Sequence, residues 1–137
     1  MINGVVAQKL QTLDQTLTEL QSLGKVDVAG LHGDWRTRRA VERDLQVLVE
    51  VVIDICQRLI SVAGHAPAAT SADAIDRCIQ LGVVSEDEVY RQMVRFRNLI
   101  VHRYEQVDVN ILVDIVNNRL SGFERFRDEI LAYVKAD

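Results

Sequence analysis

Hydrophobic side chains recur every three or four residues along most of this chain, a period typical of helices that bury one face. The pattern predicts five helices. With their caps, the expected ranges are about 3–22, 34–64, 71–81, 85–106 and 111–135. We expect Asp34, Ser71 and Ser85 to cap the second, third and fourth helices, and Glu88 stands where it completes a capping box with Ser85.

The second predicted helix is apolar over most of its circumference. One stripe is formed by Val41, Leu45, Leu48, Val52, Ile55, Leu59 and Val62, and a second surface by Val47, Val49, Val51, Ile53 and Ile60. The polar positions that remain form a narrow line: Arg39, Arg43, Gln46, Glu50, Asp54, Gln57 and Ser61. A helix of this kind is usually central or also packs on a partner, so a small chain with such a helix is expected to form a homodimer.

Length and composition limit the fold class. The chain has 137 residues, of which 48% are hydrophobic, and proline occurs once. These values favour one all-α domain over residues 1–137, an up-and-down helical bundle of about five helices. No segment is long and apolar enough for a membrane span, and the N-terminus does not resemble a signal peptide, so we expect a cytoplasmic protein. Cys56 and Cys78 have no metal-ligand or redox spacing and are expected to be buried free thiols.

Charge is distributed unevenly along the chain. The net charge of −4 disfavours a protein that coats nucleic acid without specificity, although a local basic site is compatible with it. Thirteen of the sixteen cations are arginine, whose planar guanidinium suits carboxylates and phosphates. Four arginines and no acid lie within residues 89–103.

The fourth predicted helix carries an unusual set of polar side chains. On a helical wheel Arg91, Arg95, Asn98 and His102 share one polar face, opposite the apolar stripe. Arg97 lies off that face, and on the wheel its neighbours are Val94 and Val101. An arginine in this position must extend to solvent or meet an acceptor at an interface.

Arg97 and His102 together suit metal-independent cleavage of RNA, with no metal or cofactor expected. An imidazole can accept the proton of the ribose hydroxyl or protonate the leaving oxygen, and a guanidinium can stabilise the charge that develops on the phosphate. Spacing alone favours structural roles for these residues, because an R-x-x-x-x-H match is common by chance. In these roles His102 would cap or end a helix. A solvated face would be formed by Arg91, Arg95 and Arg103, and Tyr104 would lie at the edge of the apolar face. Glu50 and Asp54 lack the further ligands of a metal site.

Three matches make the chain resemble the HEPN superfamily, and within it the HepT toxins of prokaryotic toxin–antitoxin modules. The first is an R-x-x-x-x-H-x-Y motif formed by Arg97, His102 and Tyr104, with Asn98 after the arginine. The second is the long helix that contains residues 43–55, and the third is the Leu-Gly-Val-Val segment at 81–84 before an acidic helix start. The resemblance covers nearly the whole chain from Leu10 onward.

The resemblance implies a dimer of helical bundles that pools two motif copies in a cleft between subunits. It implies a ribonuclease toxin of a type VII-like module that cuts tRNA or mRNA, with Arg97 and His102 as catalytic residues. It also implies an MntA-type nucleotidyltransferase antitoxin that AMPylates Tyr104. Asn98, Arg91, Arg95 and Arg103 would support the site or bind RNA. The alternative is a non-catalytic helical module that docks a nucleotidyltransferase and helps it bind its substrate.

Overall fold

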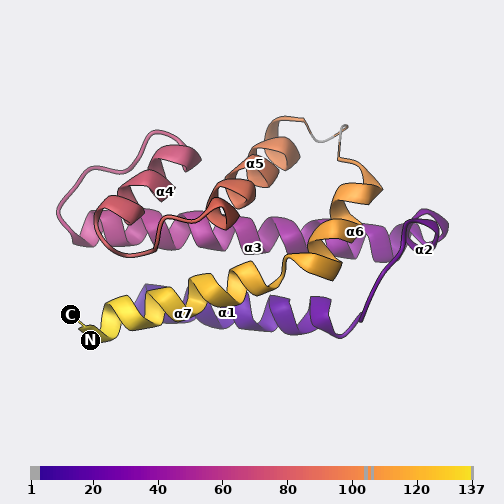
Figure 1. The fold of residues 1–137 in the computed structure, drawn as a ribbon, viewed down its shortest axis with the longest axis horizontal. Helices are drawn as coiled ribbons and strands as arrows, with labels where there is room; N and C mark the ends of the chain where they lie inside the picture. The colour runs from indigo at the N-terminus through magenta and orange to yellow at the C-terminus, as the bar shows by residue number, and fades with distance from the viewer. Residues whose placement is uncertain (1–3, 104, 106, 137) are drawn as a thin grey trace.

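The structure is a computed structural model that describes residues 4–103, 105 and 107–136, and within these ranges all regular structure is helical. Seven α-helices follow one another along the chain (Figure 1). Their bounds are α1 Gly4–Gln21, α2 Val28–Gly33, α3 Trp35–Val62, α4 Ser71–Gln80, α5 Glu88–His102, α6 Val109–Asn118 and α7 Ser121–Ala136. The predicted all-helical fold is confirmed, and the predicted number of five helices is wrong.

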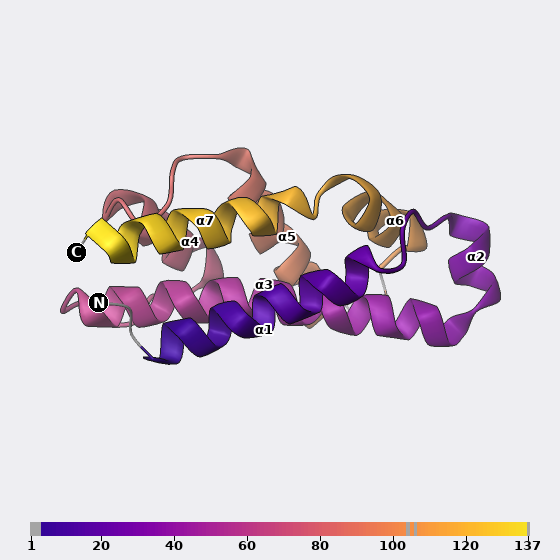
Figure 2. The same ribbon diagram turned by 90° about the horizontal axis from the view of Figure 1, so that it is seen from below.

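Helix α3 is the centre of the fold. It runs the length of the molecule, with α1 along one side and α4 and α5 along another, while α7 lies beside α1 (Figures 1 and 2). The apolar stripe expected on α3 is buried, and Leu45, Leu48 and Ile55 have no exposed surface. This arrangement fixes α5, which carries the arginine and histidine of the motif, against the middle of α3.

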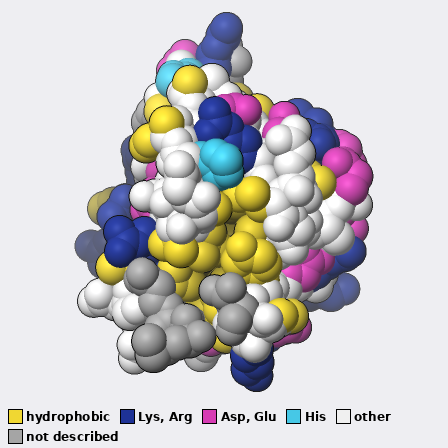
Figure 3. Space-filling view, turned by 90° about the vertical axis from the view of Figure 1, so that its left-hand side faces the viewer, with side chains coloured by type: hydrophobic (Ala, Val, Ile, Leu, Met, Phe, Trp, Pro, Cys, Tyr) yellow, Lys and Arg dark blue, Asp and Glu magenta, His cyan; other side chains and the backbone are white. Residues whose placement is uncertain are grey.

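The second apolar surface of α3 is covered by the chain itself. Val49, Val51, Ile53 and Ile60 are buried, and Val47 is half-buried. Exposed apolar side chains lie at the helix ends instead, including Val62 at 59%, and hydrophobic groups gather on the end of the molecule shown in Figure 3. The homodimer therefore stays a prediction, and the covered surface of α3 is not an argument for it.

Two connections differ from the helix prediction. The segment between the first two predicted helices, where no helix was expected, contains the short helix α2, which Asp27 caps by accepting a hydrogen bond from the Gly30 amide at 2.6 Å. The expected fifth helix is two helices, α6 and α7, which meet at Arg119 and Leu120. The Asn117 amide group bonds both the N–H and the C=O of Val26, and this contact fixes the end of α6 beside the α1–α2 connection.

Asp34 caps α3 as expected, because its carboxylate accepts hydrogen bonds from the amides of the first turn. The other two predicted caps are wrong. Thr70 caps α4 by accepting from the Asp73 amide, and Asp87 caps α5 by accepting from the Val89 amide. Ser85 instead donates from its hydroxyl and its backbone amide to Glu129 of α7, at 2.6 and 2.7 Å, so a tertiary contact replaces the capping box.

The two cysteines meet between α3 and α4. Both are buried and free, as predicted, and the Cys78 thiol lies 3.6 Å from the carbonyl oxygen of Cys56. A hydrogen bond with the Cys78 side chain, together with burial, raises the pKa of the Cys56 thiol well above its usual value. Such thiols are unreactive and belong to the core.

In the part of the chain that the structure covers, no helix is long and apolar enough to cross a membrane.

Candidate functional site

Arg97 and His102 line one groove on the surface of the domain. Its volume is about 520 Å³. The groove lies between α3, the C-terminal half of α5 and the connection that leads into α4. The lining residues are Ile53, Gln57, Ala68, Ala69, Thr70, Ser71, Ala72, Arg97, Asn98 and His102. The structure thus brings together the two side chains for which the sequence predicts catalysis, and Asn98 with them.

Arg97 meets an acidic partner within its own chain. Its Nε lies 3.4 Å from a carboxylate oxygen of Glu50 on α3, and the two side chains are 25% and 35% exposed. A terminal nitrogen of Arg97 also donates to the side-chain oxygen of Asn98, at 3.3 Å. Among the residues described, the buried Nε makes no hydrogen bond of good geometry, so the contact with Glu50 is an ion pair alone.

The sequence left open whether Arg97 extends to solvent or meets an acceptor at an interface, and in the structure it meets Glu50 of its own chain. Glu50 lies on the polar line of the long helix, and the sequence did not assign it a partner. One signal was available in that pattern: an acid at the middle of an otherwise apolar helix is a suitable partner for an arginine on an apolar face.

His102 is the last residue of α5, and its side chain is exposed. It follows Arg97 by five residues, a rotation of about 140° on an ideal helix. The two side chains therefore leave α5 in different directions, yet both line the groove. An exposed imidazole on the wall of a groove can exchange protons with a bound molecule and with solvent.

Gln57 of α3 fixes the wall opposite α5. Its side-chain amide donates to the Ala68 carbonyl at 2.9 Å and accepts from the Ala68 amide at 2.8 Å. This pair of bonds ties the connection before α4 to α3. The first residues of α4, Ser71 and Ala72, therefore line the groove with a helix N-terminus, whose partial positive charge adds to that of Arg97.

The remaining arginines of α5 are held by acids. Arg91 pairs with Asp76 at 2.6 Å and with Glu86 at 3.2 Å, and Arg95 pairs with Glu88. Neither arginine lines the groove of His102, while Arg103 is exposed at the end of α5. Tyr104 lies outside the described residues.

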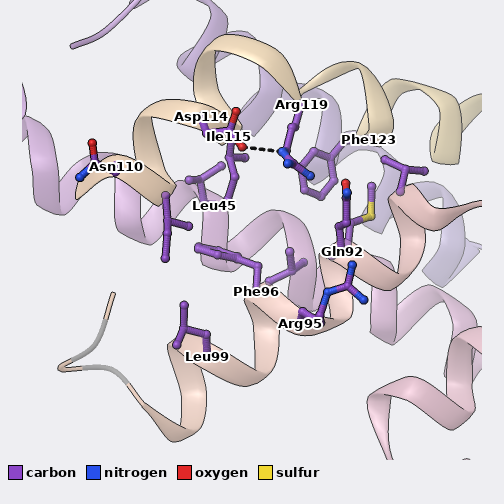
Figure 4. Close-up of a pocket in the computed structure, with 14 residues that line it drawn as sticks. Leu45, Gln92, Arg95, Phe96, Leu99, Asn110, Asp114, Ile115, Arg119 and Phe123 are labelled. Carbon is purple, nitrogen blue, oxygen red and sulfur yellow. Dashed lines mark hydrogen bonds and ion pairs between the residues drawn. The ribbon is translucent and has the colours of Figure 1, made fainter. Parts of the chain in front are cut away.

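Arg95 instead borders a second groove, on the other side of α5 (Figure 4). This groove has a volume of about 470 Å³ and a mostly apolar lining, in which Leu45, Phe96 and Phe123 come from three helices. The ion pair between Arg119 and Asp114, at 2.7 Å, lies at its edge. The groove contains neither Arg97 nor His102, so it is separate from the candidate site.

Glu50 and Asp54 are four residues apart, a spacing that suits metal ligation, but each forms an ion pair with a basic side chain. Glu50 contacts Arg97, and Asp54 lies 3.3 Å from the ammonium group of Lys9. Over the ranges that the structure describes, no three histidine, cysteine or acidic side chains are grouped as metal ligands.

Known proteins are similar to this chain in sequence. A family model described as ribonuclease HepT-like matches residues 13–130, most of the chain. A curated protein of Shewanella oneidensis, the mRNA nuclease HepT, is 25% identical over 133 residues, which are 96% of this chain and 99% of that protein.

Solved structures share the fold. A tri-AMPylated HEPN toxin of Shewanella oneidensis in complex with an MNT antitoxin is similar with a TM-score of 0.84 at 25% identity, over 96% of this chain and 99% of the other. A mutant of the toxin–antitoxin pair MntA–HpeT is similar with a TM-score of 0.80 at 26% identity, over 95% of this chain and 99% of the other.

Proposed function

This chain belongs to the HepT-like ribonuclease family and is an endoribonuclease, and we propose that it is the toxin of a toxin–antitoxin pair that cleaves RNA without a metal ion. The observation that carries the proposal is the shared groove, which holds Arg97 and His102 of one short motif. The similarity to an mRNA nuclease supports mRNA as the substrate, with tRNA as a second candidate.

The reaction follows from the chemistry of the two side chains. The neighbouring 2′-hydroxyl of the ribose attacks the phosphorus, and the bond to the 5′-oxygen breaks, which leaves a 2′,3′-cyclic phosphate and a 5′-hydroxyl. His102 removes the proton from the attacking hydroxyl or gives one to the leaving oxygen. Arg97 binds the phosphate and stabilises the additional negative charge of the transition state. Because the 2′-hydroxyl is the nucleophile, DNA is not cleaved.

Two protons move during this reaction, and each chain has one histidine in the groove. We therefore propose that the active species is a homodimer in which two copies of Arg97 and His102 face one cleft. One imidazole then acts as the base while the other acts as the acid. Sedimentation equilibrium of the purified protein tests this directly, since a stable monomer with full activity contradicts it.

Control of the toxin is proposed to act through Tyr104, two residues after His102. The tri-AMPylated state of the similar toxin supports a cognate MntA-type nucleotidyltransferase that transfers AMP to this tyrosine in the cytoplasm. An AMP group at that position adds a negatively charged phosphate close to Arg97 and His102, and it would occupy the groove and repel RNA.

The test is cleavage of total tRNA and of an mRNA by the dimer in EDTA, after intact mass has shown that the protein carries no AMP. We expect the His102→Ala variant to lose at least 100-fold in rate and Arg97→Ala to lose about 100- to 1000-fold. The chemical groups at the ends of the products are then identified, and we expect a 2′,3′-cyclic phosphate and a 5′-hydroxyl.

Two exposed residues outside the groove provide matched controls. His65→Ala removes a histidine from the connection before α4, and Arg58→Ala removes an arginine from α3. Both variants are expected to cleave at the wild-type rate. If the unmodified wild type is as inactive as the two motif variants on both RNAs, the docking module for a nucleotidyltransferase replaces the proposal.

A further inference from the structure

The chain has a single tryptophan, and the fold leaves it exposed. Trp35 is the first residue of α3, and 67% of its surface is accessible to solvent. It lies at the corner between α2 and α3, at the opposite end of the molecule from the two termini (Figure 1). A large aromatic side chain at this degree of exposure contributes little to the core and is available to bind another molecule.

An arginine covers Trp35. The guanidinium carbon of Arg36 lies 5.5 Å from the centre of the indole ring, the geometry of a cation–π contact. Such a pair offers a flat aromatic surface next to a positive charge. Proteins that hold single-stranded nucleic acid combine these two elements, because bases stack on aromatic rings and arginines contact the phosphates.

The surroundings of Trp35 are charged. Residues 32–43 contain four arginines and two acids, and both acids are engaged within the helix. Asp34 caps α3, and Glu42 pairs with Arg38 at 3.0 Å and Arg39 at 3.7 Å. The other large exposed apolar side chains lie on other segments, at Val5, Leu23, Val62 and Val101. The excess of arginine over acid at this corner suits the phosphates of a nucleic acid.

Trp35 and Glu50, the partner of Arg97, lie on the same side of α3. Going round the helix at about 100° per residue, Arg39, Arg43 and Glu50 lie within about 80° of Trp35. Arg39 and Arg43 are exposed on that face, and the Arg39 side chain is 61% accessible. Glu50 then contacts Arg97. Fifteen residues separate Trp35 from Glu50, a distance of roughly 22 Å along the helix.

We propose that Trp35 and Arg36 form a stacking site for one unpaired base of the RNA whose scissile phosphate lies at Arg97. This inference rests on the proposed function, because it places the same RNA strand at both sites. At a stacked rise of about 3.4 Å per nucleotide, the two sites are on the order of six nucleotides apart. The enzyme therefore prefers unpaired RNA long enough to reach both.

The single tryptophan makes the site directly observable. A 2′-O-methyl RNA cannot supply the attacking hydroxyl, so it binds without being cleaved. We expect a single-stranded 2′-O-methyl oligonucleotide of on the order of ten nucleotides to quench the fluorescence of Trp35 on titration, and one of two or three nucleotides to bind without reaching it. A duplex of the same length, whose bases are already stacked, is expected to quench much less.

Variants connect this signal to the stacking contact. Trp35→Ala, followed by the anisotropy of a labelled oligonucleotide, is expected to weaken binding of the longer strand about 10-fold, and Trp35→Phe to restore most of it. Arg36→Ala is expected to weaken binding and to lower its salt dependence. Arg58→Ala, which removes an exposed arginine from the far end of the same helix, is the matched control and is expected to bind as the wild type does.

The readouts separate this inference from the proposed function. If RNA is cleaved at Arg97 and His102, while the oligonucleotide neither quenches Trp35 nor loses affinity in Trp35→Ala, the stacking site is wrong and the ribonuclease stands. If quenching occurs in a protein that cleaves no RNA, the binding site stands and the catalytic proposal fails. A Trp35→Ala variant that binds RNA normally but has a changed oligomeric state in sedimentation assigns Trp35 to an interface between copies, which overturns the inference.

Discussion

The carboxylate of Glu50 lies 3.4 Å from Nε of Arg97, and this contact joins the middle of α3 to the last turns of α5. Both side chains are partly shielded from solvent, so the pair is stronger than one on the open surface. Together with the hydrogen bond from Arg97 to Asn98, it fixes the direction of the guanidinium at the groove. Glu50 is in this sense a positioning residue for Arg97.

The Glu50→Gln variant is expected to lower kcat/KM for RNA about 10-fold, which corresponds to about 1.4 kcal/mol. The amide keeps the shape of the side chain but loses the charge, so Arg97 becomes free to adopt other rotamers. Because an alternative rotamer places the charge away from the phosphate in the transition state, kcat should fall more than KM rises. Steady-state cleavage of a short RNA measures both.

Asp54→Asn is the control for this variant. Asp54 lies one turn further along α3 and pairs with Lys9 at 3.3 Å, outside the groove. Its removal should cost a similar, small amount of stability and leave cleavage unchanged. Equal losses of activity in the two variants would show that Glu50 acts through the stability of α3 and not through Arg97.

Much of this site could be predicted from the sequence. The motif identified Arg97, Asn98 and His102, and all three line one groove. The partner Glu50 and the wall residue Gln57 were not predicted, since their roles depend on how α5 and the α3–α4 connection pack against α3. Such packing is a long-range property that helical periodicity does not contain.

The helix prediction was wrong at two caps and at the break between α6 and α7. The caps expected at Ser71 and Ser85 follow local rules, yet Thr70 and Asp87 are as suitable chemically and lie only one or two residues away. Ser85 instead donates a hydrogen bond to Glu129 of α7, so its side chain does not cap a helix. The break between α6 and α7 is absent from the apolar pattern because Val116, Leu120 and Phe123 keep helical spacing on both sides of it.

Gln57→Ala is expected to destabilise the protein by about 1 to 3 kcal/mol, since it leaves the backbone N–H and C=O of Ala68 without their partners. It should also raise KM, because the wall that carries Ser71 and Ala72 is no longer tied to α3. Urea unfolding and steady-state kinetics measure the two effects. Gln46→Ala, which replaces a half-buried glutamine of α3 outside the groove, serves as the control and should leave KM unchanged.

The stability of the domain is expected to depend on Asp44. Burial, together with a hydrogen bond and the charge of Glu19, raises the pKa of Asp44 to about 6. The folded protein thus holds a proton that the unfolded chain releases near pH 4, so this group lowers the free energy of unfolding as pH rises from about 4 to about 6. Asp44→Asn cannot ionise and should be more stable than the wild type by about 1 kcal/mol at neutral pH.

Thermal unfolding of the Asp44→Asn variant across this pH range provides the test. The difference from the wild type should vanish below about pH 4, where both states of the wild type are protonated. Asp114→Asn is expected to behave in the opposite way, since hydrogen bonds from Asn118 and Arg119 lower the pKa of Asp114. That variant should lose stability at neutral pH. A pH-independent difference for Asp44→Asn would contradict the raised pKa of Asp44 in the folded protein.

Gly122 allows α7 to approach α5 closely. A Cβ at this position would lie 2.5 Å from a methyl carbon of Val89 and 3.2 Å from the terminal methyl of Met93. Gly122→Ala is therefore expected to destabilise the fold by about 1 to 3 kcal/mol through overpacking, and Val89→Ala in the same chain should restore more than half of the loss. Gly33→Ala meets no atom within 4 Å and should change stability by less than about 0.5 kcal/mol. Urea unfolding of the four variants decides the matter, because additive losses in the double variant would show that the two residues are not in contact.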